Sequence, residues 1–412
     1  MKRRVVITGI GAVTPLGNTM KDTWSALCEG VSGIAHITRF DASYFPSMIA
    51  GEIKGFSAGL FITKKGLRRL DPFIHYATAS ALMAVEDSEV RFESTEKERY
   101  GVVIGSSRGG ILSTEASYNQ YLHKGPHGIT PFYTPMSTIG MAAGYIAIRL
   151  RINGPSLGIS TACSSGTHAI GEAYRMIQRG EVELVFTGGT EASISPLILG
   201  GYAAAKVLST RNNEPQKASR PFDRHRDGFV LSEGACILVL EEMQHALQRN
   251  ARIYAEIIGY GSSTDAYHQT DLPPDGSGAV MAMRKALMDA NISPSEIDYI
   301  NAHGTSTLQN DRVETLAIKT VFNKDAFKIP VSSIKSMTGH MLAASGALEV
   351  GATAMSIYEG IIPPTINYEM PDSECDLDYV PNTTRRQQIE IALTNSFGFG
   401  GMNAVIVLRK SV

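Results

Sequence analysis

The chain has 412 residues, of which 43% are hydrophobic and 19% are charged, and its formal net charge is -2. This length predicts two domains or one large duplicated core, and the composition is typical of an ordinary soluble globular protein. The near-neutral charge gives no sign of a nucleic-acid partner, and no apolar run without a charge is long enough to cross a membrane.

The first predicted strand lies in RRVVITGIG, residues 3–11. Basic residues before an apolar run are also seen in signal peptides, but Gly9, Gly11 and Pro15 interrupt this run, so we expect a strand followed by a turn. The two glycines also suggest a dinucleotide-binding loop. That fingerprint fails because Thr14 stands at the third glycine position.

Further strands are predicted in residues 100–107, 183–190 and 236–242, alternating with helical patterns such as residues 166–180. This alternation predicts an α/β fold with helices layered on buried sheets. Similar strand-and-turn units follow residue 251, at 251–265, 297–307, 328–349 and 389–401.

The second half of the chain therefore looks like a degenerate copy of the first. We expect two halves, residues 1–251 and 252–412, with their sheets back to back and their terminal loops meeting at one shared site. In this alignment the turn that contains Cys163 corresponds to the turn that contains His340.

The four cysteines are far apart and show no paired spacing, which argues against a disulfide framework or a zinc site and fits a cytoplasmic location. Cys163 differs from the others because it follows a β-branched run and precedes a small-residue helix. A thiol at a helix start faces unpaired N–H groups and the positive end of the helix dipole, which favours the thiolate. A buried structural cysteine is the alternative, and it is the interpretation kept for Cys28, Cys236 and Cys375.

Two of the ten histidines, His303 and His340, lie in turns rich in Gly, Ser and Thr, where the backbone can approach a ligand closely. Together with Cys163 they form a Cys-His-His set. A cysteine hydrolase usually needs one histidine and an orienting Asn or Asp. Two neutral imidazoles that both donate N–H bonds are better suited to holding a thioester carbonyl and stabilising an enolate after loss of carbon dioxide.

The last glycine-rich turn, NSFGFGGMN, places backbone N–H groups around Phe399. With the N–H of Cys163 they could form an oxyanion hole. The alternative for this turn is a strand end closed by an aromatic side chain.

The motifs TACSSG, NAHGTST, KSMTGH and NSFGFGG, in this order and spacing, resemble those of the β-ketoacyl-[acyl-carrier-protein] synthases, specifically the elongating enzymes of bacterial type II fatty acid synthesis. The similarity runs from end to end of the chain. It implies a thiolase-like fold with a duplicated α-β-α-β-α core, and a homodimer or a heterodimer with a related chain-length subunit. It also implies an acyltransferase that needs no cofactor of its own, because the 4'-phosphopantetheine arm is carried by acyl carrier protein.

The resemblance assigns roles to residues in these motifs. Cys163 would take an acyl chain from acyl carrier protein, and His303 and His340 would promote decarboxylation of the malonyl unit that is then condensed with it. Lys335 and Glu349 would support the histidines, and Phe399 would act as a gate between the two half-reactions. The predicted substrate contacts are Thr270, Thr305 and Thr307 along the pantetheine arm, with Arg108 and Tyr202 near the acyl group.

A basic stretch, TKKGLRRLD, places Lys65, Arg68 and Arg69 on one predicted helical face, and Lys206 lies on a separate segment near the expected mouth of the site. A solvated helix face is the simpler interpretation. Because acyl carrier protein is acidic, the resemblance turns these residues into a predicted docking patch.

Arg108 is the main departure from the family pattern, because an apolar residue commonly lines the acyl pocket in the middle of the GSSRGG motif. A buried guanidinium without a partner is costly, so Arg108 must be paired, reach solvent or meet a polar group. Lesser departures are Met402, where Thr is usual, and the segment after Thr270. The Arg108 departure leaves a second interpretation open, the catalytic ketosynthase subunit of a type II polyketide or polyene synthase paired with a related non-catalytic partner. A non-catalytic chain-length subunit is disfavoured because the chain keeps Cys163 and both histidines.

Overall fold

The computed structural model describes residues 2–91 and 97–411. The elements of the first half are β1 (Val5–Val13), α1 (Met20–Glu29), β2 (Ala35–His36), β3 (Ile49–Ala50), α2 (Lys64–Leu67), α3 (Pro72–Ser88), β4 (Tyr100–Gly105), α4 (Ile111–Lys124), α5 (Tyr133–Ser137), α6 (Met141–Leu150), β5 (Ser156–Ile159), α7 (Ser165–Gln178), β6 (Leu184–Glu191), α8 (Pro196–Ala204), β7 (Gly234–Glu242) and α9 (Met243–Gln248). Those of the second half are β8 (Ala255–Thr264), α10 (Ser277–Ala290), β9 (Tyr299–Asn301), α11 (Leu308–Phe322), β10 (Val331–Ser332), α12 (Lys335–Thr338), α13 (Ala343–Glu359), β11 (Ile361–Ile362), β12 (Arg385–Arg386), β13 (Ile391–Gly398) and β14 (Met402–Arg409).

The central sheet has ten strands in the order β10-β9-β13-β14-β8-β1-β7-β6-β4-β5. From β1 outward, β7 and then β6 add antiparallel, and β4 and β5 add parallel. From β8 outward, β14 and β13 add antiparallel, and β9 and β10 add parallel. The two halves thus repeat one topology, which agrees with the predicted duplication, while a division into domains at residue 251 stays a prediction.

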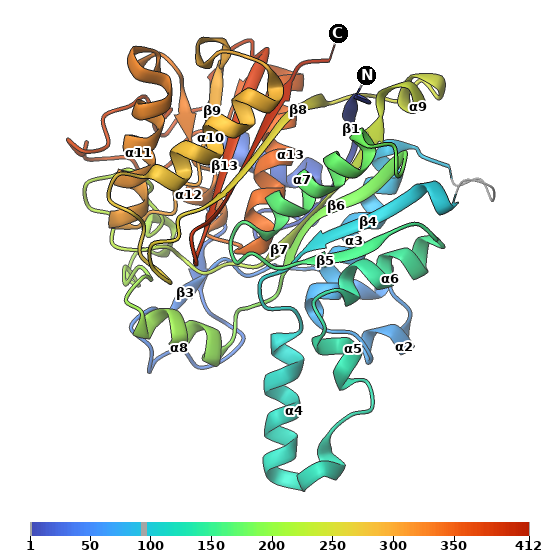
Figure 1. Ribbon diagram of the computed structural model, residues 1–412. Helices are drawn as coiled ribbons and strands as arrows, with labels where there is room; N and C mark the ends of the chain where they lie inside the picture. Colours follow the sequence, from blue (N-terminus) through green and yellow to red (C-terminus); the bar gives the residue numbers. More distant parts are fainter. Residues whose placement is uncertain (1, 92–96, 412) are drawn as a thin grey trace.

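The sequence led us to expect two separate sheets. In the structure the two half-sheets are joined. Strands β1 and β8 pair antiparallel, with Val5 opposite Ile257, and join the halves into one continuous sheet. Helices α7 and α13 pack against each other and against strands of both halves, while α3 and α6 cover the first half and α10 the second (Figure 1). The result is the predicted thiolase-like succession of helix and sheet layers.

Glycines in β1 serve helix packing and do not end the strand. Strand β1 continues through Gly9 and Gly11, and the turn comes only at residues 14–17. A side chain at Gly11 would overlap the Ser80 carbonyl of α3. Gly261 of β8 has the same relation to Ala282 of α10, so the repeated glycine pattern marks two places where a helix lies directly on its strand.

Small residues also bring the first turns of α7 and α13 together. A side chain at Gly166 would overlap the Ala343 carbonyl, and one at Gly346 would overlap the Thr167 hydroxyl. Cys163 precedes α7 and His340 precedes α13. The close approach of the two helix starts therefore places the predicted nucleophile and a predicted histidine side by side, as the internal alignment suggested.

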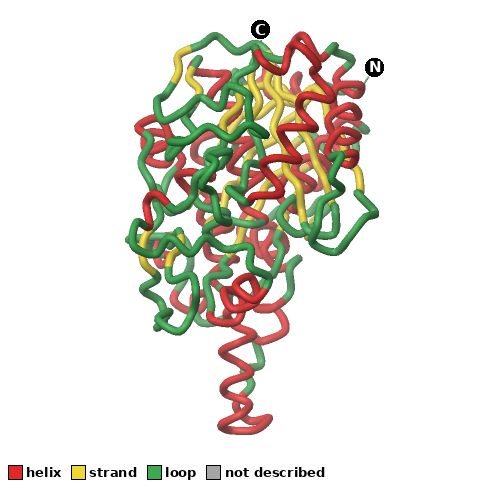
Figure 2. The backbone as a smooth tube through the Cα atoms, turned by 90° about the vertical axis from the view of Figure 1, so that its left-hand side faces the viewer, coloured by secondary structure: helices red, strands yellow, loops and turns green. Residues whose placement is uncertain are grey.

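Helix α4 and the segment that follows it extend away from the sheet as a projecting arm (Figures 1 and 2). Its exposed apolar side chains include Tyr118 and Leu122. Strand β5 at the edge of the sheet is also exposed, with Leu157 48% accessible. Within the described residues, no helix combines the length and apolar character needed to cross a membrane.

Candidate active site

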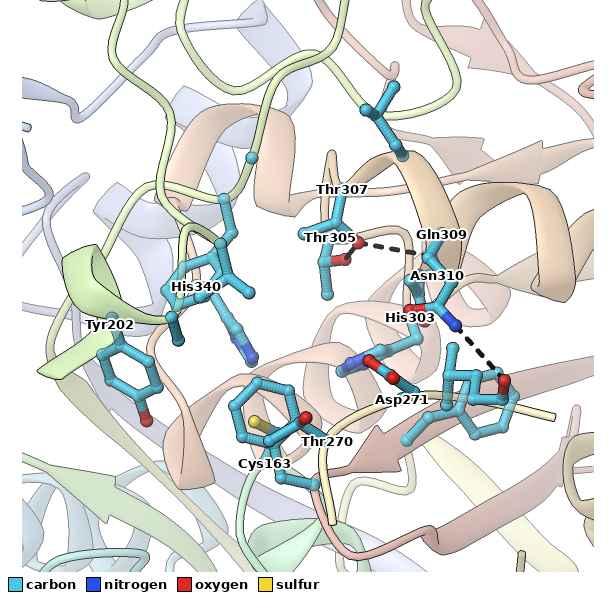
Figure 3. A pocket seen from close by; sticks show the side chains of 18 of the residues that line it. Cys163, Tyr202, Thr270, Asp271, His303, Thr305, Thr307, Gln309, Asn310 and His340 are labelled. Carbon is cyan, nitrogen blue, oxygen red and sulfur yellow. Dashed lines mark hydrogen bonds between the residues drawn. The ribbon is translucent and has the colours of Figure 1, made fainter. Parts of the chain in front are cut away.

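A cavity of about 280 Å³ lies where the two halves meet. It is lined by the thiol of Cys163 and by the rings of His303 and His340, which Figure 3 shows turned toward the same space. Other lining residues include Tyr202, Lys206, Phe229, Thr270, Thr305, Thr307, Leu342, Phe397 and Phe399. The three residues of the predicted Cys-His-His set are thus brought together from distant parts of the chain.

Cys163 lies in a tight turn between β5 and α7. The preceding residue, Ala162, has a positive φ of 51°, a backbone conformation that costs energy for a residue other than glycine. The hydroxyl oxygen of Ser164 lies 2.8 Å from the carbonyl oxygens of both Thr161 and Met402, which share its one proton. This bridge ties the cysteine turn to the last glycine-rich turn. Because it uses the backbone of Met402, the side-chain departure there leaves the bridge unaffected.

The Cys163 thiol is only 9% exposed, and this burial raises its pKa to about 11. The charge of Lys335 and the N–H of Phe399 oppose that rise, but they do not overcome it. Burial therefore opposes the thiolate that the helix start was expected to favour in the site without substrate. Desolvation of the charged sulfur outweighs the nearby positive charge.

His303 is held through its backbone by a buried carboxylate. Glu314 accepts hydrogen bonds from the N–H groups of His303 (2.8 Å) and Gly304 (2.7 Å) and from the side chain of Asn395 (3.0 Å). Sequence reasoning missed Glu314. The available signal was its place on the apolar face of α11, where Ala317, Ile318 and Val321 follow at helical spacing.

Lys335 fixes the ring of His303. Its ammonium group forms a buried ion pair with Glu349, donates to the His303 carbonyl at 2.6 Å and lies 3.3 Å from Nδ1 of the same ring. An ammonium group can only donate, so Nδ1 must accept and the neutral ring carries its proton on Nε2. Lys335 thus contacts His303 directly, whereas Glu349 acts on the histidine only through its ion pair with Lys335.

His340 is oriented in a similar way by a different group. Its Nδ1 lies 3.1 Å from the hydroxyl of Ser345, and that hydroxyl accepts the N–H of Met341 at 2.8 Å. The serine can give its proton to Nδ1, and in that arrangement the proton of His340 lies on Nε2. The backbone of His340 is anchored to Ser232 and Val230.

The two imidazoles lie edge to face, with centroids 5.5 Å apart. Burial lowers both pKa values well below the usual value, and the charge of Lys335 lowers them further. Both rings are neutral at physiological pH. Two neutral Nε2–H donors facing a thiol are suited to binding one carbonyl oxygen that becomes negatively charged.

The aromatic wall beside the thiol consists of Phe399, Tyr202 and Phe229. The ring of Tyr202 lies 5.2 Å from that of Phe229 and 6.3 Å from that of Phe399. Phe399 is half-buried and its N–H faces the sulfur, so the predicted oxyanion-hole position is occupied by a backbone donor.

The three threonines predicted for the pantetheine arm all line the cavity. Thr305 and Thr307 share a hydrogen bond of 2.9 Å, and Thr270 is exposed on a separate loop (Figure 3). Lys206, one of the predicted docking residues, also lies on the cavity wall and is exposed.

Arg108 does not line the cavity. Its guanidinium lies behind Tyr202, with Nη2 3.3 Å from the phenolic oxygen. The Arg108 side chain is exposed in the isolated chain, so the expected cost of a buried, unpaired guanidinium does not arise.

The basic stretch forms a short helix with a following turn, not a long helical face. Helix α2 has four residues, Lys65 and Arg68 are exposed, and the Arg69 guanidinium stacks 4.1 Å from the ring centre of Phe132. Figure 1 shows α2 well separated from α8, which precedes Lys206. Within one chain, the predicted docking residues therefore form two separate groups.

The fold and the Cys-His-His site define a thiolase-like condensing acyltransferase. The sequence model described as Beta-ketoacyl synthase, N-terminal domain, matches residues 2–246, and that of the C-terminal domain matches residues 254–369. The chain belongs to the β-ketoacyl synthase family, and it is a condensing enzyme of fatty acid synthesis, which confirms the predicted family, fold and reaction class.

Curated relatives match over nearly their whole length. The chain is 51% identical to 3-oxoacyl-[acyl-carrier-protein] synthase 2 of Coxiella burnetii, with 99% of each chain covered. It is 48% identical to the protein of the same name from Synechocystis, with 99% of this chain and 98% of the relative covered.

Solved structures that cover 100% of both chains share the fold. The ketosynthase of a type II polyketide synthase, bound to a hexaketide and in complex with its acyl carrier protein, is 37% identical with a TM-score of 0.93. A β-ketoacyl synthase from Burkholderia phymatum is 34% identical with a TM-score of 0.92.

Proposed function

We propose that the chain joins an acyl group to a malonyl unit, both delivered on acyl carrier protein, by a two-stage condensation. In the first stage the sulfur of Cys163 attacks the acyl thioester and the pantetheine thiol leaves. In the second stage the malonyl thioester loses carbon dioxide, and the resulting enolate carbon attacks the Cys163 thioester. A carbon–carbon bond forms, the thiol is released, and the product is a 3-oxoacyl thioester.

One observation carries this proposal: the imidazole rings of His303 and His340, whose pKa values burial lowers, face the same cavity as the Cys163 thiol (Figure 3). Their role is to hold the malonyl thioester carbonyl and to stabilise the enolate oxygen. The N–H groups of Cys163 and Phe399 are the proposed oxyanion hole for attack on the acyl thioester. Phe399 is the proposed gate because its ring packs against Tyr202 at the cavity wall.

The test is a two-step reaction with free pantetheine thioesters and mass spectrometry of the protein. Butyryl-pantetheine is expected to add one butyryl mass at Cys163, and malonyl-pantetheine is then expected to remove it and yield a 3-oxohexanoyl thioester. Release of butyric acid without carbon–carbon bond formation would instead indicate a hydrolase, and absence of the adduct would indicate a non-catalytic subunit. Repeated extension of an unreduced chain would favour the polyketide alternative, which rests on Arg108.

The proposed docking surface for acyl carrier protein consists of Lys65, Arg68, Arg69 and Lys206. Changing Lys65, Arg68 and Lys206 together to Glu is expected to raise KM for carrier-bound substrates about tenfold or more, since each removes an attractive charge for an acidic partner. Steady-state kinetics should show that added salt weakens the unaltered protein more than the variant.

Free pantetheine thioesters provide the control for this prediction, because they lack the acidic carrier. Their kcat/KM is expected to stay within about twofold in the triple variant. An equal loss with both kinds of substrate would place the three residues outside a docking surface.

We propose a homodimer that buries the exposed edge strand β5 and part of the projecting arm. The exposed β5 edge leaves backbone groups available for pairing with another strand, and Leu157, Tyr118 and Leu122 supply apolar surface. Light scattering that gives the mass of a single chain at micromolar concentration would contradict this assembly.

A further inference from the structure

The wall of the active-site cavity changes from apolar to polar at Tyr202. Beside Cys163 the cavity is lined by Phe229 and Leu342, which are suited to contact with methylene groups and belong to a buried apolar cluster with Ile194 and Leu199. The Tyr202 ring belongs to this cluster, but its hydroxyl points to Arg108. Directly behind the apolar lining there is therefore a phenol paired with a guanidinium.

The backbone of Arg108 is fixed in place. Glu191, which is fully buried at the end of β6, accepts the N–H groups of Ser107 at 2.9 Å and Arg108 at 3.2 Å. The hydroxyl of Ser193 donates to the same carboxylate at 2.8 Å. Hydrogen bonds to Glu191 thus fix the backbone of the turn that carries Arg108, and they define the position from which its side chain extends.

The guanidinium of Arg108 keeps most of its hydrogen-bonding capacity. It has five N–H donors, and within the described residues its one side-chain hydrogen bond goes to Tyr202. It forms no ion pair with any described carboxylate, because the oxygens of Glu191 are directed to backbone groups. A planar group with free paired donors is suited to binding a carboxylate or another oxygen acceptor.

We propose that Arg108 and Tyr202 form a specificity-determining pair that favours acyl groups whose far end carries an oxygen acceptor over saturated acyl groups of the same length. An alkyl end that reaches the pair must displace water from the guanidinium and offers no hydrogen bond in return. A carboxylate end binds both the guanidinium and the phenol. This inference rests on the proposed function, since it concerns the acyl group held on Cys163.

The test compares two pantetheine thioesters of equal length: octanoyl, and the eight-carbon acyl group that ends in a carboxylate. The measured quantity is the ratio of their kcat/KM values, which does not depend on how much of a preparation is active. The unaltered protein is expected to prefer the carboxylate-ended primer by about tenfold or more. Arg108→Met should reverse this preference, and Tyr202→Phe should weaken it.

Arg284→Met is the matched control, because Arg284 is exposed on α10 and does not line the cavity. Its primer ratio is expected to equal that of the unaltered protein. The proposal is overturned if the unaltered protein uses octanoyl as well as the carboxylate-ended primer, or if Arg108→Met leaves the ratio unchanged. Extension of butyryl-pantetheine by the unaltered protein separates this result from failure of the condensing activity itself.

Discussion

Cys163→Ala is expected to abolish acylation and to lower condensation by at least about 10⁴-fold, because the change removes the sulfur that is proposed to carry the acyl group. Mass spectrometry after incubation with butyryl-pantetheine should show no adduct, and product formation should fall to background. The fold should remain, since alanine fits a turn whose neighbouring residues are already small. Circular dichroism and the unfolding temperature check this point.

Cys236→Ala is the matched control for the loss of a buried thiol. Cys236 is fully buried in β7, outside the cavity, so its replacement can affect stability but should leave acylation intact. Cys163→Gln provides a second readout. It should still release carbon dioxide from malonyl-pantetheine, because His303 and His340 remain. Condensation near the unaltered rate in Cys163→Ala would remove the basis of the nucleophile assignment.

The raised pKa of Cys163 gives this prediction a pH dependence. With a pKa of about 11, the thiol is protonated at neutral pH. As long as the pH stays below the pKa, each increase of one pH unit raises the thiolate fraction about tenfold. Alkylation of Cys163 by iodoacetamide should therefore accelerate steadily from pH 7 to pH 10. A plateau near pH 7 would show instead that the helix start holds the sulfur as a thiolate.

The sequence predicted those features that depend on local pattern. Strands with continuous apolar runs and the small-residue starts of α7 and α13 follow directly from residue type. The repeat of a glycine pair in β1 and β8 also indicated the duplication. The role of those glycines was misread, because whether a glycine turns the chain or admits a helix depends on what packs against it. Helix α3 packs directly on Gly11, and strand β1 continues through this glycine.

The structure brings together at one cavity the active-site residues that the motifs predicted. The groups that support those residues could not be predicted from motifs. Glu314 binds the backbone N–H of His303, 11 residues earlier, and Ser345 contacts the ring of His340, 5 residues earlier; no spacing rule specifies such contacts. The protonation of Cys163 likewise depends on how much water reaches the sulfur. The position of Arg108 behind Tyr202 required the fold, since the two residues are separated by 94 positions.

Replacing His303 or His340 by alanine is expected to reduce malonyl decarboxylation by about 10²-fold or more, while acylation of Cys163 changes by less than about tenfold. Each variant loses one Nε2–H donor to the enolate oxygen, whereas the proposed oxyanion hole for acylation consists of backbone groups. The measurements are carbon dioxide release from malonyl-pantetheine and the rate of butyryl adduct formation. His36→Ala is the control, because His36 is exposed and outside the cavity.

The pH dependence of decarboxylation tests the same assignment in the unaltered protein. The pKa values of His303 and His340 are lowered, so both rings stay neutral as the pH falls from 8 to 6, and their Nε2–H donors persist. The rate should therefore be nearly constant over this range, without the decline near pH 6.5 that an unperturbed histidine base would cause. If acylation fell as much as decarboxylation in both alanine variants, the histidines would be activating the thiol. A decline of the decarboxylation rate below pH 7 would contradict the lowered pKa values, because it would mean that a ring takes up a proton in this range and that decarboxylation needs it unprotonated.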